Sequence, residues 1–400
     1  MSAFSILAGR TEAEAAGAWH TAREIAQQPV VWQKVLTLLE AREGDIRGFL
    51  SRAGATGAAG ARETAIVLTG AGSSDYVGRA VAASLAARLG RAVSAVGTTH
   101  LVTHPVTRLD PARRAVVVHF ARSGDSPESL AAWRILHRER PDAAHAVITC
   151  NEAGALGRAA AADPSALLLV LPPETNDRSL AMTSSFTSMA LCGIALGWVG
   201  ELAALRRRME PVRAAVRRVI LTDADLLETI AGRPFDRACF LGSDVLEGAM
   251  NEGALKMLEM TAARVTSISN SFLGLRHGPM VFVNERCLVV ACLSSDARVR
   301  RYELDLLRSL RAKGQGDAVL AISSVDDPGM EGCVDFTVRL GGESGAAAGP
   351  IADDLRVLTD VAVCQLLAFA TSRARGLAPD NPSPEGVISR VVQGVTLYDA

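Results

Sequence analysis

Residues 64–90, TAIVLTGAGSSDYVGRAVAASLAARLG, decide the fold that we expect for this 400-residue chain. An apolar run, TAIVLTG, ends in the turn AGSSD, and an Ala-rich helical segment begins directly afterwards. Further apolar runs follow at residues 93–99, 114–120, 145–150 and 165–172. Continuous Val, Ile and Leu runs that alternate with helices are typical of a parallel sheet covered on both faces. The first half of the chain therefore predicts an α/β domain with a parallel sheet.

The second half of the chain repeats this pattern, with strand-like runs at residues 237–245, 286–296, 318–324 and 333–340. Three strand ends share one offset of 172 residues, which pairs Gly70 with Gly242, Phe120 with Cys292 and Ala146 with Ala318. A constant offset across three strands indicates a duplicated α/β domain.

The length also favours two domains, because 400 residues exceed a single typical core. We expect a helical segment over residues 1–53, a first α/β domain over 54–210, a second over 211–378 and a loop-like tail over 379–400. A long apolar helix is expected over residues 183–205. Its Met189–Gly200 stretch and the apolar N-terminal helices are candidates for either an interface or the core of the chain.

Composition excludes several classes of protein. A hydrophobic content of 49% with 21% charged residues is that of a globular protein, and a net charge of −1 argues against a nucleic-acid surface. The seven cysteines form no CxxC pair and the histidines show no ligand spacing, so we expect no disulfide framework, metal or other cofactor. No signal peptide is apparent, and the longest apolar run, residues 189–200, is too short to span a bilayer. We therefore expect a cytoplasmic protein that binds neither membrane nor nucleic acid.

Two turns of the first half carry polar side chains where strands lead into helices. In a parallel sheet, ligands bind beyond the carboxyl ends of the strands, and a helix N-terminus favours an anion. Glycines there let the backbone approach a ligand, and hydroxyls donate hydrogen bonds to it. We therefore favour a phosphate site over two ordinary Ser/Gly turns. Its candidate residues are Ser73, Ser74, Arg122, Ser123 and Ser126, and Gly72 is a candidate contact to the substrate.

The corresponding helix of the second half lies within residues 251–280, NEGALKMLEMTAARVTSISNSFLGLRHGPM. Glu252, Lys256 and Glu259 share one helix face, and His277 follows shortly afterwards. Either they form a buried ion pair and a loop histidine, or they transfer protons on a small polar substrate. The 172-residue offset places this helix as the counterpart of the one after AGSSD, so we expect Lys256 and Glu259 at the same sheet edge. This favours Glu259 as a general acid and base.

These motifs resemble those of a known family. AGSSD and SGDSPES resemble the two phosphate-binding signatures of sugar isomerase (SIS) domains, here in tandem. TAREIAQQPVVW, ITCNEAGAL, AMTSSFTSM, GALKMLEMT, RHGP and SRVVQGV resemble the bacterial galactosamine-6-phosphate deaminase/tagatose-6-phosphate ketose-aldose isomerase family over nearly the whole chain. The isomerase half of glucosamine-6-phosphate synthase is more distantly similar. The resemblance implies two SIS domains, each a three-layer αβα sandwich of flavodoxin-like type.

The resemblance also implies roles for individual residues. Glu259 moves a proton between C1 and C2 of the sugar, and Lys256 orients the substrate or this glutamate. His277 assists ring opening, from its own subunit or from a neighbouring one. The four serines at positions 73, 74, 123 and 126 bind the sugar phosphate. The synthase's imine-forming lysine corresponds to Arg390 if the tails align, and arginine cannot form that imine.

The function so implied is conversion of D-galactosamine 6-phosphate to tagatose 6-phosphate and ammonia by a homo-oligomer, either a dimer or a tetramer. The alternatives are a plain aldose–ketose isomerase, a glucosamine-6-phosphate deaminase, a lactyl amino sugar etherase and a non-catalytic sugar-phosphate sensor. A sensor has no need of a glutamate, a lysine and a histidine together. Further candidate substrate contacts are Glu252 and, in a tail that closes over the site, Asn381, Ser383 and Arg390.

Overall fold

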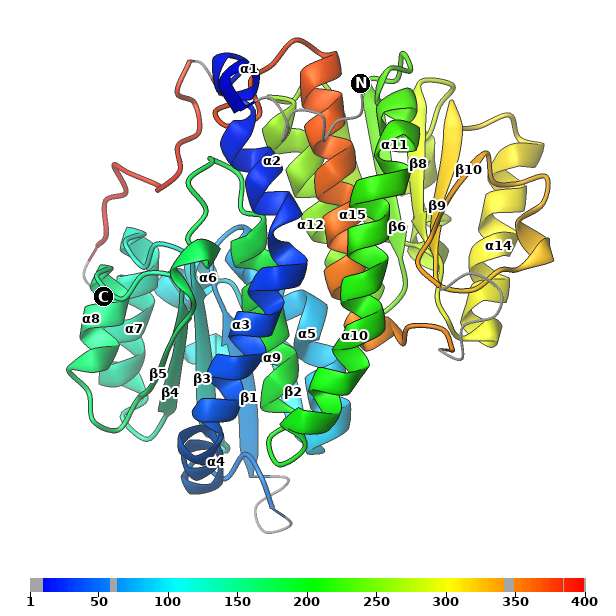
Figure 1. Ribbon diagram of the computed structural model, residues 1–400. Helices are drawn as coiled ribbons and strands as arrows, with labels where there is room; N and C mark the ends of the chain where they lie inside the picture. Colours follow the sequence, from blue (N-terminus) through cyan, green and yellow to red (C-terminus); the bar gives the residue numbers. More distant parts are fainter. Residues whose placement is uncertain (1–9, 58–62, 342–348, 384, 399–400) are drawn as a thin grey trace. The chain divides into compact units, whose positions relative to one another are not determined.

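The structure is a computed structural model that describes residues 10–57, 63–341, 349–383 and 385–398. The chain forms two compact units, each of which contains one β-sheet (Figure 1). The first-sheet unit comprises Val30–Asp177, Ser184–Arg207 and the residues from Gly386 onward. The second-sheet unit comprises the residues up to Pro29, Arg178–Thr183 and Arg208–Glu385. Both the N-terminal helical segment and the C-terminal tail are therefore divided between the two units.

The first sheet is parallel and has the order β2-β1-β3-β4-β5. Its strands are β1 (Thr64–Thr69), β2 (Ala92–Ala95), β3 (Arg114–Ala121), β4 (Ala144–Thr149) and β5 (Leu167–Val170). The chain enters each neighbouring strand through a helical crossover, as a parallel sheet requires. The predicted parallel sheet of the first half is confirmed.

Helices cover both faces of the first sheet. Val117 and Val147 pack with α6 (Thr98–Thr103), α7 (Pro127–Glu139) and α8 (Ala155–Ala161). On the other face lie α5 (Ser73–Leu89) and α9 (Ser184–Leu196), where Gly193 approaches Val81 and Phe120. The short helices η2 (Val106–Arg108) and η3 (Pro173–Thr175) lie in connections. This is the expected three-layer arrangement.

The second sheet is also parallel, with the order β7-β6-β8-β9-β10. Its strands are β6 (Arg237–Gly242), β7 (Thr266–Ser271), β8 (Cys287–Cys292), β9 (Ala318–Ser323) and β10 (Phe336–Arg339). If each sheet's strands are numbered along the chain, both sheets have the same order. The connection between β6 and β7 is α12 (Val245–Met260), and that between β8 and β9 includes α14 (Ala297–Ala312).

The second sheet is covered in the same way. Its core on one face joins Leu241 and Val289 to α13 (Phe272–Leu275) and to the apolar side of α14. On the other face α12 packs against α15 (Asp353–Ala374), which also contacts α11 (Ala224–Ala231). Shorter helices are η4 (Val219–Asp223), η5 (Pro279–Phe282) and η6 (Pro328–Met330). By length and composition α15 resembles a membrane span, but its whole apolar window is buried, so it is a core helix.

Gly70 and Gly242, which the 172-residue offset pairs, have the same structural reason to be glycine. A Cβ atom on Gly70 would lie 2.4 Å from the backbone carbon of Ser74, and one on Gly242 would lie 2.4 Å from that of Leu246. Real Cβ atoms do not approach backbone this closely, so the first turn of each following helix requires glycine before it. The offset therefore pairs residues with the same structural role.

The predicted helix over residues 183–205 is wrong in its length. Helix α9 ends at Leu196, and a turn containing Gly197 and Gly200 separates it from α10 (Leu202–Arg218). Gly200 has φ of 96°, a left-handed conformation that ends a helix readily. All residues of α9 are buried inside the chain, so α9 belongs to the core.

The N-terminal helices also contribute to the core. They are α1 (Arg10–Ala15), α2 (Trp19–Ala26), α3 (Gln28–Ala41) and α4 (Glu43–Arg52). Within the first-sheet unit, the buried Trp32 donates a hydrogen bond from Nε1 to Thr187 Oγ1 at 3.1 Å. Within the second-sheet unit, Thr21 donates from its backbone N–H to Asp380 Oδ1 at 2.7 Å. The apolar faces of these helices are thus covered by the same chain.

Candidate functional site

The first polar turn lies at the carboxyl end of β1. Gly72, with φ of 58° and ψ of −127°, precedes the first residues of α5, Ser73 and Ser74. These serines are 4% and 5% exposed, so both are buried at this edge of the sheet. The 17-residue α5 directs its N-terminal end at the same point. The structure therefore places three of the predicted residues where a helix N-terminus favours an anion.

The second polar turn, Arg122 to Ser126, follows the adjacent strand β3. Ser126 precedes α7 and Pro127 is the first residue of that helix. The Ser123 hydroxyl accepts a hydrogen bond from the Asp125 N–H at 3.2 Å, which leaves its proton for another acceptor. Because β1 and β3 are neighbours, both predicted turns lie at one edge of the first sheet. We call this edge, defined by Gly72, Ser73, Ser74, Arg122, Ser123 and Ser126, the first polar edge.

Arg122 is linked to the C-terminal tail. Its Nη2 donates to the backbone carbonyl of Arg390 at 2.5 Å. The Arg390 side chain donates in turn to the Asp177 carbonyl at 2.8 Å and to Asn176 Oδ1 at 2.6 Å. The Asp177 carboxylate accepts from the N–H of Ser185 at the start of α9, at 2.9 Å. Sequence reasoning placed Arg390 near the substrate but missed Asn176 and Asp177, because only the fold brings this loop to the tail.

Glu252, Lys256 and Glu259 form one ion-pair cluster on α12. Lys256 and Glu252 are completely buried, and the Lys256 Nζ lies 3.4 Å from Glu252 Oε1. The ammonium also pairs with Glu259 Oε2, whose side chain is 23% exposed. Of the two carboxylates, that of Glu259 is therefore partly accessible from outside, while that of Glu252 is completely buried. The buried ion pair that was one of the two expected alternatives is therefore present, and it consists of the same residues that were the candidates for proton transfer.

The expected position of this cluster at the carboxyl edge of the second sheet is wrong. Helix α12 begins beside the carboxyl end of β6 and runs back to reach the amino end of β7. Glu259 is the last residue but one of this helix, 14 residues after its start at Val245. At 1.5 Å per residue this is about 21 Å, roughly the length of a strand. Lys256 and Glu259 thus lie toward the amino edge of the second sheet.

His277 lies near the opposite edge. It follows α13, which begins directly after the carboxyl end of β7, and its side chain is exposed. The six residues of β7 separate the two edges by about 20 Å. Within the described residues, the His277 ring has no hydrogen-bond partner, and only its backbone N–H is bonded, to Gly274. The structure therefore does not bring His277 to the Glu259 of its own chain.

The remaining tail candidates lie in the second-sheet unit. Asn381 is exposed and donates its backbone N–H to the Ala378 carbonyl at 3.1 Å, while Ser383 is 7% exposed. Between them and α15, the Asp380 carboxylate caps α2 through the N–H groups of His20 and Thr21. This part of the tail is held by capping bonds, whereas Arg390 belongs to the first-sheet unit.

Three of the histidines, His119, His137 and His145, pack together in the first-sheet unit. His119 Nε2 and His145 Nδ1 are 3.1 Å apart, and the rings of His145 and His137 stack at 4.2 Å. His137 lies 3.1 Å from Asp163 Oδ2. Burial lowers the pKa of His145 to about 3, and burial together with His145 and His137 lowers the pKa of His119 well below its usual range. Both buried rings are therefore neutral at neutral pH.

This cluster predicts acid-sensitive stability. Unfolded histidines bind protons below about pH 6.5, and the folded protein does not protonate His119 and His145 there, so its stability falls as the pH falls below that value. We expect each ring to contribute about 1.4 kcal/mol per pH unit. Denaturant unfolding at pH 7 and pH 5 measures this slope. The H145N variant is expected to have a shallower slope, the exposed control H100Q an unchanged one, and equal slopes in all three proteins would refute the assignment.

Comparisons with known proteins agree on one family. A Streptomyces coelicolor protein, itself only provisionally called D-galactosamine-6-phosphate deaminase AgaS, is 41% identical over 95% of this chain and 95% of its own length. D-galactosamine-6-phosphate deaminase AgaS of Escherichia coli is 37% identical over 96% of this chain and 97% of its own. A solved structure of tagatose-6-phosphate ketose/aldose isomerase from Escherichia coli matches with a TM-score of 0.83 and 33% identity. The match covers 95% of this chain and 97% of that one.

A more distant similarity covers part of the chain. Glutamine–fructose-6-phosphate aminotransferase of Mycolicibacterium smegmatis is 25% identical over 68% of this chain and 42% of its own length. No protein-family model matches the chain. Both expected relationships, the near and the distant one, are thereby confirmed.

Proposed function

Because this chain belongs to the AgaS family of galactosamine-6-phosphate deaminases, we propose that it converts D-galactosamine 6-phosphate to tagatose 6-phosphate and ammonia. The observation that carries the proposal is the 37% identity to the Escherichia coli deaminase over nearly the full length of both chains. The chain is an enzyme of this family, and its substrate is a sugar phosphate. The partly exposed carboxylate of Glu259 beside a buried ammonium supports proton transfer on that substrate.

In this proposal the first polar edge binds the phosphate. Hydroxyl and N–H donors at the starts of α5 and α7 approach its oxygens, and the guanidinium of Arg122 supplies positive charge. The Arg390 carbonyl fixes the orientation of Arg122, so we assign Arg390 a positioning role beside its candidate contact with the substrate. Gly72 lets the backbone approach the phosphate. An anchored phosphate places the reacting carbons by geometry.

Glu259 then transfers the proton. In the open-chain sugar its carboxylate takes the C2 proton while the aldehyde oxygen at C1 takes up another, which gives a C1–C2 enaminol. Return of the proton to C1 gives an imine at C2, and addition of water releases ammonia and leaves the ketose. Lys256 orients Glu259 for the first step through their ion pair. With a hydroxyl at C2, the same transfer is a plain aldose–ketose isomerisation.

Removal of the Ser123 hydroxyl tests the phosphate role. We expect S123A to raise KM for the sugar phosphate about 10- to 100-fold, because a hydrogen bond to a charged group contributes about 1.5–3 kcal/mol. Steady-state kinetics measure this, with S84A on the far part of α5 as the matched control. An unchanged KM in S123A would remove Ser123 from the phosphate site.

His277 is proposed to serve the site of a second copy of the chain. It lies about one strand length from its own Glu259, and exposed apolar side chains lie beside it in sequence, Leu273 at 51% and Val281 at 87% exposure. Such a surface fits an interface with another copy. A homo-oligomer, with a dimer as its smallest form, would then be required for ring opening by His277.

Mixing two inactive variants tests this arrangement. In a symmetric dimer, E259Q subunits paired with H277A subunits have one intact site of two, and random pairing yields about a quarter of wild-type activity. The variants are mixed under mild dissociating conditions, reassociated and assayed. Each variant alone is the control: an active H277A protein would place His277 outside the reaction, and a mixture that stays inactive although hybrid dimers form would place it in the site of its own subunit.

A substrate panel distinguishes the alternatives. The purified protein is incubated with galactosamine 6-phosphate, glucosamine 6-phosphate and galactose 6-phosphate, and ammonia and ketose phosphate are measured separately. We expect ammonia from galactosamine 6-phosphate at the highest kcat/KM. Faster release from glucosamine 6-phosphate favours the epimeric deaminase, ketose formation from galactose 6-phosphate alone favours an isomerase, and no product from any of them favours a sensor.

Three further assignments complete the proposal. The identical strand orders and the 172-residue offset support an internal repeat of two SIS domains, over residues 54–210 and 211–378, with a helical segment before them and a tail from 379. The seven cysteines are all free and buried, which supports a reducing, cytoplasmic location. Release of ammonia by water from the imine makes the reaction a hydrolysis.

A further inference from the structure

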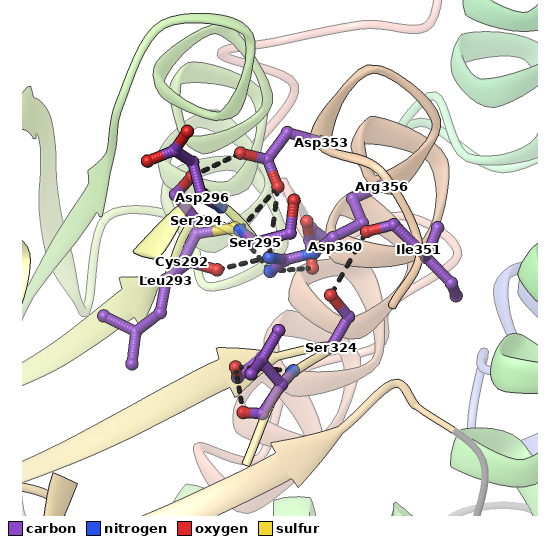
Figure 2. A network of polar contacts seen from close by, with 12 residues as sticks. Cys292, Leu293, Ser294, Ser295, Asp296, Ser324, Ile351, Asp353, Arg356 and Asp360 are labelled. Atoms are coloured by element: carbon purple, nitrogen blue, oxygen red, sulfur yellow. Dashed lines mark hydrogen bonds and ion pairs between the residues drawn. The ribbon is translucent and has the colours of Figure 1, made fainter. Parts of the chain in front are cut away.

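The carboxyl edge of the second sheet carries a polar network that the proposed reaction does not use. Ser243 follows β6, and Ser294 and Ser295 follow β8, so these residues occupy the edge that corresponds to the first polar edge. The ion-pair cluster of Glu252, Lys256 and Glu259 lies toward the other edge of this sheet. Figure 2 shows the part of the network around Asp353 and Arg356. We call the network of Ser243, Ser294, Ser295, Glu303, Asp353 and Arg356 the second polar edge.

The backbone of the two edges is alike. Gly72 before α5 has φ of 58° and ψ of −127°, and Asp244 before α12 has φ of 54° and ψ of −122°. This conformation is unfavourable for any residue with a Cβ atom, and it persists only where the surrounding structure imposes it. The second edge thus retains the turn that precedes an anion-binding helix start, even with an aspartate in the position of the glycine.

The hydroxyls of Ser243 and Ser294 and the N–H groups of Ser294 and Ser295 all meet carboxylates of the same chain. Glu303 accepts from the Ser243 hydroxyl at 2.6 Å and from the Ser294 N–H at 2.8 Å. Asp353 accepts from the Ser294 hydroxyl at 2.5 Å and from the Ser295 N–H at 2.8 Å (Figure 2). Two hydroxyls and two strand-end N–H groups are the donors that an oxyanion attracts.

A buried guanidinium completes this environment. Arg356 is completely buried, lies 3.6 Å from Asp353 and 3.2 Å from Asp360, and donates to the Ile322 carbonyl at 3.0 Å. Its Nε has no hydrogen-bond partner in the part of the chain that the structure describes. Arg356 therefore brings positive charge to the Asp353 carboxylate and keeps one N–H without a partner among the described residues.

The first half lacks these carboxylates. The residues 172 positions before Glu303 and Asp353 are Ala131 and Ala181. We propose that Glu303 and Asp353 occupy, as internal carboxylates, the anion position of the second polar edge, so that this edge is a phosphate site closed by its own chain and a chain binds one sugar phosphate. The proposal rests on the proposed function only for its comparison with the first polar edge.

Opening the site tests the proposal. Burial raises the pKa of Glu303 to about 7, so the experiments are done at pH 8, where this carboxyl is ionised. The variant S123A/E303A/D353A reproduces the alanines of the first half at the second edge and weakens the first. Inorganic phosphate is the probe. Its effect on the melting temperature is measured for this variant, for S123A and for the isosteric control S123A/E303Q/D353N.

We expect phosphate to raise the melting temperature of the alanine variant, with an apparent affinity at least about tenfold above that of either control, as expected for one charge-assisted contact. A folded alanine variant without this gain overturns the proposal. If the alanine variant does not fold, equilibrium dialysis of the wild type with phosphate decides. One equivalent or fewer per chain supports a closed second edge, and a second equivalent that S123A leaves in place overturns it.

Failure of the proposed function has a different signature. If the first polar edge is not a phosphate site, the S123A variant binds phosphate as tightly as the wild type does. The gain in phosphate affinity of the S123A/E303A/D353A variant is then still compared with that of S123A and of S123A/E303Q/D353N, so the two failures can be told apart.

Discussion

The E259Q variant is expected to lose turnover by about 10²- to 10⁴-fold, the range that a positioned general acid and base contributes. Glutamine keeps the shape of the side chain but takes up no proton, so the C2 proton stays in place. Because the phosphate contacts belong to other residues, affinity for galactosamine 6-phosphate is expected to stay nearly unchanged. Steady-state ammonia release gives kcat, and calorimetric titration gives the affinity.

The matched control for this variant is E247Q. Glu247 is a half-buried glutamate on the same helix, in its first turn, and it lies at the opposite end of α12 from Glu259. E247Q is expected to retain wild-type kcat. Normal turnover by E259Q, or an equal loss in both variants, would show that Glu259 is not the acid and base.

The K256M variant is expected to lose about 3–5 kcal/mol of free energy of unfolding, together with most of its activity. Methionine fills a similar volume, but Glu252 then loses the ammonium that neutralises it in a completely buried position. An uncompensated buried charge is far more costly than a missing neutral contact. Denaturant unfolding measures the loss.

Two companion variants identify the cause of that loss. The double variant E252Q/K256M removes both charges and is expected to recover most of the stability but none of the activity. The exposed pair of Lys34 and Glu174 gives the control K34M, for which we expect a change within about 1 kcal/mol. If the double variant were no more stable than K256M, packing and not charge would explain the effect.

Much of the fold follows from local patterns in the sequence. Continuous Val and Ile runs identified the parallel strands, since strands buried on both faces need apolar side chains on both. The constant offset from Gly70 to Gly242 identified corresponding strand ends, because the same close approach of backbone requires glycine at both. The end of α9 was missed because Gly197 and Gly200 are short interruptions in an otherwise apolar run.

The site was less predictable because it depends on direction and on long-range contacts. The spacing of Lys256 and Glu259 gave their common helix face, yet the edge they occupy follows from the direction in which α12 runs. His277 is close to Glu259 in sequence, but β7 carries the chain to the other edge before it. No local pattern indicates that the Arg390 carbonyl meets Arg122, or that Glu303 meets Ser243.

The most direct test of the central claim follows galactosamine 6-phosphate by proton NMR in the presence of the wild-type protein and of E259Q. With the wild type, we expect the C2 proton signal of the sugar to disappear at the rate at which equal amounts of tagatose 6-phosphate and ammonia form, and with E259Q we expect it to persist. A C2 signal that disappears with the wild type without formation of tagatose 6-phosphate and ammonia, or that disappears equally fast with E259Q, would contradict deamination by proton transfer through Glu259.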